Sequence, residues 1–264
     1  MKLSLLVNTL LTFPKIEKEE DGKYFELSQA DFKEIVEKTA FACSADDSRP
    51  ILKGCLFEIN DGELTAVALD GFRMSVVKKK VVSNANLKAV IPSRALFEIT
   101  RILEKDDNIL KILLQNNSLF VQVENTCLSS RLIEGEFVKY NHILPNAFEN
   151  KVTVNRQALL TSIERASIVA RNDRYNVVKF DVKENVMTVS AKSEVGCVNE
   201  NLTVILSRKD ITIACNGKYL SEYLKIVDAE FIDLNLNSPI DPCVIKTVGN
   251  EEFLYLVLPV RINA

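Results

Sequence analysis

TAVALDGFRMSV, residues Thr65–Val76, is the most informative segment of this chain. Its apolar side chains recur at alternate positions as far as Leu69, which is typical of a β-strand. Asp70-Gly71 then interrupts the pattern, and this dipeptide most often forms a hairpin turn. Arg73 follows between two large apolar neighbours, although turn residues are usually small and polar. The segment therefore predicts two strands that meet at a sharp corner, and such a corner can display an apolar patch beside a fixed cation.

Helices and strands are predicted on both sides of this corner. Ser28 stands where an N-cap belongs, and apolar residues three and four positions apart predict a helix that runs from there to about Cys43. Pro92-Ser93 opens a second helix over 94–103. The predicted strands cover 24–27, 52–59, 63–69, 73–80, 88–91, 109–114, 118–124 and 127–133.

The second half of the chain repeats the first. A strand and cap at Val152–Asn155 match those that end at Ser28, and further residues pair in the same order. The pairs are Leu27 with Val154, Phe32 with Leu159, Val36 with Ile163, Lys38 with Arg165, Phe41 with Ile168, Phe57 with Phe180, Ala66 with Val189, and Glu98 with Glu222. Because short turns join consecutive strands, we predict an α+β fold of two tandem repeats, each with antiparallel sheets, two helices and its own core, that pack edge to edge.

Composition bounds the classes of function. The 264 residues are 47% hydrophobic and 26% charged, and the formal net charge of −3 argues against a protein that is basic all over. The six cysteines lie far apart without a C-x-x-C pair, so we interpret them as reduced core residues and expect a cytoplasmic location. No apolar run approaches the ~18 residues that a membrane span needs. We interpret Met1–Leu11 as a strand or helix cut from something larger, not a signal peptide.

Four ordered motifs resemble the bacterial DNA polymerase III β subunit, the sliding-clamp family. They are RPILKGCLFE with ALDGFRM (Arg49–Glu58 and Ala68–Met74), IPSRAL (Ile91–Leu96), SRLIEGEF (Ser130–Phe137) and YLVLPVRI (Tyr255–Ile262). The similarity runs from about Phe13 to the end of the chain. It implies a DNA-clamp fold in a three-domain subunit that forms a head-to-tail dimeric ring. On this resemblance we expect 1–22 to be a connector and remnant of a preceding domain, 23–149 to be middle-domain-like and 150–264 to be C-terminal-domain-like.

The resemblance also implies a function. A complete clamp has no catalytic activity or cofactor; it encircles duplex DNA and tethers the polymerase III catalytic subunit, the clamp loader and other proteins with a clamp-binding motif. Clamps capture short peptides, which carry a Gln and a hydrophobic pair, in an apolar pocket between the second and third domains. The matching positions here are Leu52, Leu69, Gly71, Phe72, Arg73, Met74, Val138, Ile143, Asn216, Tyr219, Leu256, Leu258, Pro259, Val260 and Arg261.

Two departures from the family qualify this expectation. Leu69, Phe72 and Val138 stand where the family often has Thr, His and Pro, so a more apolar pocket with an altered peptide preference is expected. The chain also matches only two of the three repeats, so either it is an excised or truncated piece or another chain takes part in ring closure.

Duplex DNA is expected to contact cations on the helices weakly, without base readout and with strong salt dependence. The DNA-facing candidates are Lys33, Lys38, Arg94, Arg101, Arg156, Arg165, Arg171 and Lys218, from a pool that also includes Arg174 and Lys225. Glutamates interleave with these cations, so a solubilising surface of mixed charge is the alternative interpretation.

Two other classes of function stay open from the residues alone. A small hydrolase or nuclease would use Asp70. The alternative interpretation is structural: the Arg73 guanidinium holds the Asp70 carboxylate and so fixes the corner. The chain has one histidine, His142, and no nucleophile elbow, phosphate-binding loop or metal-ligand spacing, so no catalytic or metal site is predicted. The third hypothesis is a repeat-built interaction module unrelated to replication.

Overall fold

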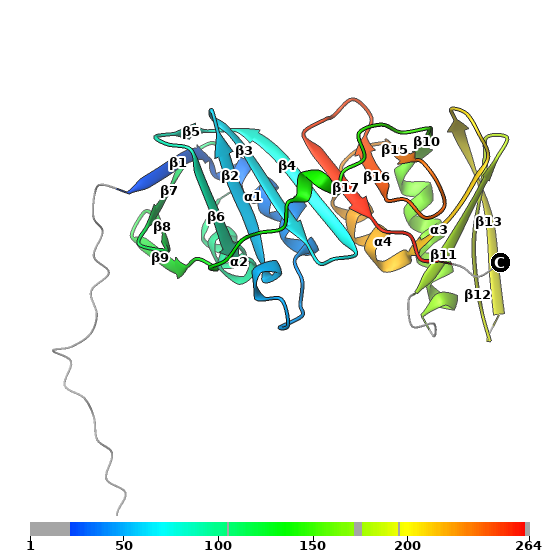
Figure 1. The fold of residues 1–264 in the computed structure, drawn as a ribbon, viewed down its shortest axis with the longest axis horizontal. Coiled ribbons are helices and arrows are strands. Elements are labelled where there is room, and N and C mark those ends of the chain that lie inside the picture. Colours follow the sequence, from blue (N-terminus) through cyan, green and yellow to red (C-terminus); the bar gives the residue numbers. More distant parts are fainter. Residues whose placement is uncertain (1–21, 105, 172–175, 195, 262–264) are drawn as a thin grey trace, which may run out of the picture.

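The structure is a computed structural model that describes residues 22–104, 106–171, 176–194 and 196–261. The predicted connector before Gly22, together with Arg174 and Ile262, lies outside these residues. Within them the chain forms two halves of similar architecture that lie side by side along the long axis of the molecule (Figure 1).

The two halves contain the same order of elements. The first half has β1 (Lys23–Ser28), α1 (Gln29–Thr39), β2 (Gly54–Asn60), β3 (Glu63–Leu69), β4 (Arg73–Lys80), β5 (Val82–Ser83), β6 (Leu87–Pro92), α2 (Ser93–Ile102), β7 (Ile109–Gln115), β8 (Ser118–Val123) and β9 (Thr126–Arg131). The second half has β10 (Asn150–Asn155), α3 (Arg156–Ala170), β11 (Val177–Lys183), β12 (Val186–Ser193), β13 (Gly196–Leu206), β14 (Ile211–Asn216), α4 (Gly217–Ile226), β15 (Phe231–Leu236), β16 (Cys243–Thr247) and β17 (Phe253–Val257). The predicted α+β fold of two tandem repeats is confirmed.

Equivalent caps start the first helix of each half. The Ser28 hydroxyl accepts a hydrogen bond from the Asp31 N–H at 3.0 Å, and the Asn155 side chain accepts one from the Ala158 N–H at 3.0 Å. Each bond satisfies one of the backbone donors that a helix start leaves without a partner. The prediction that the first helix reaches Cys43 was wrong: α1 ends at Thr39, a short 3₁₀ helix covers Ala40–Ala42, and Cys43 is extended.

A twelve-stranded sheet crosses from one half to the other. Its order is β14-β11-β12-β13-β10-β15-β16-β17-β4-β3-β2-β6, and β5-β1-β7-β8-β9 form a second sheet of five strands in the first half. The long strand β13 pairs with β12 and then with β10, whereas the first half divides the corresponding strand into β4 and β5. The pairing of β17 with β4 joins the halves edge to edge.

Near the turn at Asp70-Gly71, buried side chains pack on both faces of this sheet. The four helices lie on one side in the row α2, α1, α4, α3, and the main core lies between them and the strands. On the opposite face lies a second group of buried side chains, called here the outer cluster: Leu52, Leu56, Val67, Leu69, Met74, Val76, Val90, Phe137, Tyr140, Val244 and Leu256. Successive residues of β3 lie alternately in the main core and in the outer cluster: Ala68 belongs to the main core and Leu69 to the outer cluster.

The cysteines agree only in part with expectation. All six are free thiols, and Cys55, Cys215 and Cys243 are buried. Cys127 and Cys197 are exposed, so the prediction of core positions was wrong for these two: Cys127 lies on the edge strand β9, and Cys197 lies in the first part of β13, before the residues that pair with β10. None of the helices among the described residues has the length and apolar character to span a membrane.

Candidate binding site at the junction of the two halves

The corner after β3 lies against the end of the last strand. β17 pairs antiparallel with β4, with Val257 opposite Arg73 and Tyr255 opposite Ser75. Just beyond the paired residues, the Leu258 N–H donates a hydrogen bond of 2.8 Å to the Phe72 carbonyl. The strand pairing therefore brings together two segments that are far apart in the sequence.

The corner itself is a tight hairpin turn. Gly71 has φ of +96°, a backbone conformation that glycine adopts without a steric penalty and that other residues rarely adopt. The Asp70 Oδ1 atom accepts hydrogen bonds from the N–H groups of Phe72 at 2.8 Å and Arg73 at 3.0 Å. These bonds hold the turn while the Phe72 side chain projects outward, 57% exposed.

Arg73 is buried and links the two halves; it is not an exposed cation at the border of the binding surface. Its Nε donates to Asp70 Oδ2 at 3.0 Å, its Nη2 donates to the Phe41 carbonyl at 2.9 Å, and its Nη1 forms an ion pair with Glu222 of α4. The guanidinium carbon lies 4.5 Å from the centroid of the Tyr219 ring, close enough for a cation–π contact. Burial acts to lower the pKa of Arg73, but the hydrogen bond to Glu222 and the nearby carboxylates raise it overall, so the group stays charged.

Aromatic rings pack beside Arg73 on the face of the sheet that the helices cover. Tyr255 of β17 stacks on Tyr223 of α4 at 4.7 Å and on Phe41 of the first half at 5.6 Å between ring centroids. The Tyr255 hydroxyl donates to the Tyr219 carbonyl at 3.0 Å. Phe41, Tyr223 and Tyr255 were not predicted to contact one another, because nothing local in the sequence shows that they meet across the junction.

An apolar surface lies on the other face of the junction. Four of the predicted contact residues, Leu52, Leu69, Met74 and Leu256, are buried members of the outer cluster and form its base. Four others are at the surface: Phe72 is 57% exposed, Val138 40%, and Ile143 and Leu258 are each 36% exposed. Large exposed apolar side chains above a buried apolar base are a feature of protein-binding surfaces.

The segment 132–149 that connects the halves carries two of these exposed residues. It crosses the outer face of the first half (Figure 1), and its Phe137 and Tyr140 are buried in the outer cluster. The Tyr140 hydroxyl donates to Glu58 Oε2 at 3.2 Å, and burial together with this carboxylate raises the pKa of Tyr140 to about 12. Val138 and Ile143 therefore lie on a segment that is anchored on the same base.

The remaining predicted contact residues hold the elements in place. The Asn216 side chain caps α4 by accepting from the N–H groups of Lys218 and Tyr219. Pro259 and Val260 are half-buried, and the Val260 N–H donates to the Ala214 carbonyl at 2.7 Å. Of the two cations predicted at this site, Arg261 is exposed to solvent and Arg73 is buried.

Both oxygens of the Asp70 carboxylate accept hydrogen bonds that have a structural role. Oδ1 accepts from two backbone N–H groups and Oδ2 accepts from Arg73. The described residues contain no group of His, Cys, Asp and Glu side chains suited to a metal ion. This geometry supports the interpretation of Asp70 as the residue that fixes the corner.

The predicted DNA-facing cations all lie on or at the end of the four helices, but most of them have partners. Lys38 pairs with Glu34, Arg101 with Glu98, Arg165 with Glu200 and Lys218 with Glu222. Lys33 donates to the Leu103 carbonyl and Arg156 to the carbonyls of Leu224 and Ala229. Arg94 and Arg171 are exposed. The helix side is thus a surface of mixed charge, which suits weak contact with phosphates better than tight binding.

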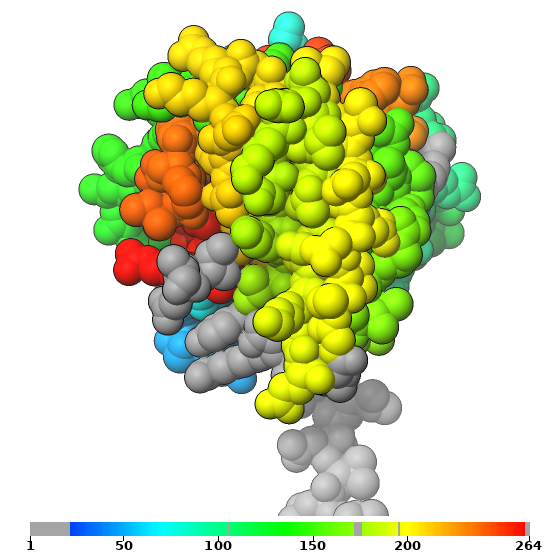
Figure 2. All heavy atoms as spheres, turned by 90° about the vertical axis from the view of Figure 1, so that its right-hand side faces the viewer, coloured from blue at the N-terminus to red at the C-terminus, as the bar shows by residue number. Residues whose placement is uncertain are grey.

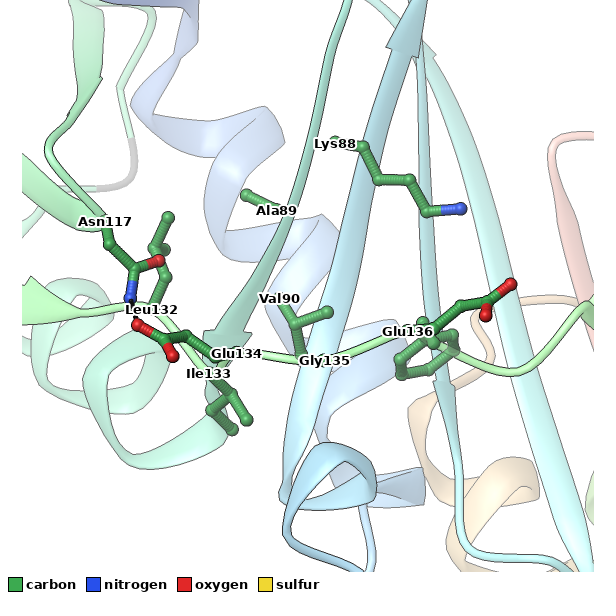
Figure 3. Close-up of a pocket in the computed structure, with 10 residues that line it drawn as sticks. Lys88, Ala89, Val90, Asn117, Leu132, Ile133, Glu134, Gly135 and Glu136 are labelled. Atoms are coloured by element: carbon green, nitrogen blue, oxygen red, sulfur yellow. Dashed lines mark hydrogen bonds between the residues drawn. The ribbon is translucent and has the colours of Figure 1, made fainter.

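A surface hollow of about 470 Å³ lies elsewhere, between β6 and the segment 132–137 (Figure 3). Its lining consists of Lys88, Ala89, Val90, Asn117, Leu132, Ile133, Glu134, Gly135, Glu136 and Phe137. The Asn117 amide donates to Glu134 at 2.6 Å on one wall. The hollow includes none of the predicted contact residues, although Val90 and Phe137 of the outer cluster line it.

Comparisons with known proteins agree with this architecture. The family pattern of the DNA polymerase III beta subunit, central domain, matches residues 26–139, and that of its C-terminal domain matches residues 141–261. The Beta sliding clamp of Halalkalibacterium halodurans is 31% identical over 256 residues, which cover 94% of this chain and 67% of that protein. The Beta sliding clamp of Streptococcus pneumoniae is 32% identical over 236 residues, which cover 88% of this chain and 62% of that protein.

Solved structures are similar over nearly the whole chain. The DNA polymerase sliding clamp from Bacillus subtilis superposes with a TM-score of 0.91 at 27% identity and covers 96% of this chain and 68% of that one. The DNA polymerase III beta chain from Streptococcus pneumoniae has a TM-score of 0.91 at 30% identity, with 97% and 69% covered. The chain thus spans about two thirds of the length of the proteins that it matches.

Proposed function

The chain belongs to the DNA polymerase III β subunit family of sliding clamps, non-catalytic processivity factors of DNA replication, and from this membership we propose that it tethers replication proteins to duplex DNA. The proposed partners are the polymerase III catalytic subunit, the clamp loader and other proteins with a clamp-binding peptide. Each would dock at the junction of the two halves. We place its action in the bacterial cytoplasm, in agreement with six free thiols.

One observation carries this proposal: β17 places Leu258 directly beside Phe72. Phe72 and Leu258 are both exposed and stand two positions along the strands from Met74 and Leu256 of the outer cluster, so an incoming apolar side chain can contact both of them. An apolar base with a few polar groups at its border is what a short linear peptide with two adjacent hydrophobic residues requires.

The departures from the family define the expected ligand more closely. Leu69 belongs to the outer cluster, and Phe72 presents an aromatic ring to solvent. Phe72 adds apolar area that a bound peptide can cover, whereas Leu69 is already buried in the base, and burial of apolar area contributes about 25 cal/mol per Å². We therefore propose that this surface favours peptides with large aliphatic or aromatic side chains in the hydrophobic pair.

For the contact with DNA we propose the helix side of the molecule. The row α2, α1, α4, α3 presents the exposed Arg94 and Arg171 together with cations that pair with carboxylates. We expect weak, non-specific phosphate contacts whose strength falls steeply with salt. A protein that moves along DNA is served by such contacts, because tight ion pairs would hold it in place.

We also propose 23–149 and 150–264 as the two domains. Each contains one complete set of repeat elements, and the connecting segment 132–149 packs on the first half through Phe137 and Tyr140 before β10 begins.

The test is a binding titration with a fluorescent peptide of the Gln-x-x-Leu-Phe type. We expect saturable micromolar binding by the chain, and loss of binding in Leu258→Asp, since a carboxylate would be desolvated against the apolar base. Val82→Asp is the matched control, because Val82 is 66% exposed on β5 and lies in none of the predicted contacts. Equal affinity of Leu258→Asp and the unchanged chain would refute the assignment of the site.

A further inference from the structure

We propose that the hollow beside β6 binds an extended basic segment of a partner protein, whose backbone adds a strand to the open edge of β6. The hollow lies between β6 and the segment 132–137 and includes none of the residues predicted to bind peptides at the junction. The inference rests on the backbone pairing of β6 and on the charge around the hollow. It therefore does not depend on the peptide-binding function proposed for the junction.

The register of β6 shows which of its backbone groups face the hollow. β6 is the last strand of the twelve-stranded sheet, and among the described strands it pairs with β2. The Val90 carbonyl accepts a hydrogen bond from the Ile133 N–H at 2.8 Å, so it points away from β2. In an antiparallel pair the N–H and C=O of one residue point to the same side, and residues two positions apart point the same way. Lys88 therefore also directs its N–H and C=O away from β2.

Three backbone groups on this edge have no strand partner among the described residues. They are the N–H and C=O of Lys88 and the N–H of Val90. Ile133 covers the Val90 carbonyl alone, because the chain then crosses the outer face of the first half toward the buried Phe137 (Figure 1). Since Lys88, Ala89 and Val90 all line the hollow, another chain can reach this edge. An open edge of this kind is a template for an extended peptide.

The hollow has room for a short segment of peptide. Its volume of about 470 Å³ lies within the range of about 300–1,000 Å³ that is usual for ligand pockets. In Figure 3, Asn117 and Glu134 lie toward one end, Lys88 and Glu136 lie toward the other, and Val90 lies between them. A strand along β6 would thus have a carboxylate toward each end of the hollow.

The charge around the hollow indicates a cationic ligand. Glu134 and Glu136 are both exposed. Lys88, the cation in the lining, lies with its Nζ 3.5 Å from Glu58 Oε1 and is therefore already paired. The Asn117 amide donates to Glu134 at 2.6 Å, but a neutral amide leaves the negative charge in place. Complementary charge on a partner would come from Lys or Arg side chains.

The two faces of the added strand would meet different surroundings. Val90 belongs to the outer cluster, and Lys88, two residues before it, projects from the same face of the sheet. The segment with Glu134 and Glu136 crosses this face, whereas Leu132 packs against the main core. Because alternate side chains of a strand point to opposite faces, the matching ligand has cations at every second position and aliphatic residues between them.

The test is a titration of the full chain with the fluorescent peptide Lys-Val-Lys-Val-Lys, blocked at both ends. We expect saturable binding that weakens with salt, together with shifts of the methyl NMR signals of Val90, Leu132 and Ile133. The control peptide Lys-Lys-Val-Val-Lys has the same composition and charge without the alternation, so it should bind about tenfold more weakly. Equal affinity for the two peptides would show attraction by charge alone and would overturn the proposal.

Lys88→Pro tests the pairing with the edge of β6. The Lys88 N–H points away from β2, a position at which an edge strand tolerates proline, so the far-ultraviolet circular dichroism should stay unchanged. We expect the affinity for Lys-Val-Lys-Val-Lys to fall by about tenfold or more, because the central donor is lost. Lys88→Ala, which keeps the N–H, is the matched control and should bind at least as tightly as the unchanged chain. Equal affinities of these two variants would contradict the strand pairing.

A double variant that leaves the backbone intact tests the charge. Glu134→Gln with Glu136→Gln should weaken binding about tenfold, because two exposed ion pairs with the peptide are lost. The control is Glu184→Gln with Glu194→Gln, which removes two exposed carboxylates after β11 and β12. These strands lie at the end of the molecule that Figure 2 faces, away from β6. Equal weakening in both double variants would mean that binding follows the net charge and not the hollow.

The two proposed binding sites can be tested separately. Leu258→Asp should bind Lys-Val-Lys-Val-Lys as tightly as the unchanged chain, and Lys88→Pro should bind the Gln-x-x-Leu-Phe peptide as tightly. Failure of one proposal therefore leaves the other standing. If the unchanged chain shows no saturable binding of Lys-Val-Lys-Val-Lys, the site for a basic segment is refuted.

Discussion

At the scale of single residues, Arg73 shows how the junction is held. Its guanidinium contacts the corner through Asp70, the first half through the Phe41 carbonyl and the second half through Glu222. The pairing of Arg73 with Asp70, three residues apart, could be predicted from the sequence, but no local pattern identifies Glu222. That contact depends on the pairing of β4 with β17, which only the folded chain establishes. The same pairing buries Arg73, which the local pattern placed beside an exposed patch.

We expect Arg73→Ala to lower the free energy of unfolding by about 3 kcal/mol, because it leaves the Asp70 carboxylate, whose side chain is only 12% exposed, without its charged partner. Lys78→Ala on the same strand is the matched control. Its ion pair with Glu63 spans 3.0 Å between half-exposed side chains, so its loss should cost less than about 1 kcal/mol. Urea unfolding followed by far-ultraviolet circular dichroism measures both, and equal costs for the two variants would contradict the role given to Arg73.

Glu34 should contribute a pH-dependent part of the stability. Burial acts to raise the pKa of Glu34, but hydrogen bonds from Lys38 and Lys79 lower it overall below its ordinary value of 4.5. A carboxyl group whose pKa is lower in the folded state stabilises the fold above its unfolded pKa, and this contribution is lost as the pH falls through the folded pKa. Between pH 6 and pH 3, Glu34→Gln should therefore lose stability less steeply than the unchanged chain.

The control for this measurement is Glu230→Gln, an equal change of charge at an exposed residue before β15. Thermal unfolding across the pH series gives the slopes. Identical slopes for Glu34→Gln and the unchanged chain would mean that Lys38 and Lys79 do not stabilise the ionised carboxylate.

At the scale of elements, the sequence predicted most helices and strands because their signals are local. Alternation identified β3 and β4 with the bounds that the structure has, and Ser28 and Asn155 marked the starts of α1 and α3. The end of α1 was placed too late, because Phe41 and Cys43 continue the apolar spacing although the chain has turned into a 3₁₀ helix and an extended residue. The order of strands in the twelve-stranded sheet has no local signal and came only from the structure.

Loss of either helix cap should cost a similar amount of stability. We expect Ser28→Ala and Asn155→Ala each to lower the free energy of unfolding by about 1 kcal/mol, because each removes the partner of a backbone N–H at a helix start. Ser93→Ala is the control, since Pro92 holds the N-cap position of α2 and makes no side-chain cap bond. A cost for Ser93→Ala as large as for Ser28→Ala would argue against capping as the cause.

At the scale of the whole molecule, a continuous sheet and a shared core couple the two halves. β17 pairs with β4, the helix row is continuous through α1 and α4, and the outer cluster combines Met74 of the first half with Leu256 of the second. The candidate site exists only because of this coupling, since Phe72 and Leu258 belong to different halves. The family resemblance indicated these residues, whereas the periodicity of either half alone did not.

The two halves should unfold as one unit. We expect one calorimetric transition whose van't Hoff and calorimetric enthalpies agree, and Leu256→Ala should move this transition to lower temperature without splitting it. Leu256 is buried in the outer cluster, so its truncation should cost about 3 kcal/mol. Two separate transitions, one of them unaffected by Leu256→Ala, would show that the halves are independent.

Methyl NMR spectra of the chain, recorded while the Gln-x-x-Leu-Phe peptide is added, locate the binding surface most directly. The account predicts that the methyl signals of Leu258, Val138 and Ile143 shift with saturation, while those of the exposed Ile205 and Val82 stay in place. Shifts confined to Val90 and Ile133, which line the hollow beside β6, or no shifts at saturating peptide, would contradict the claim that the junction is the docking site.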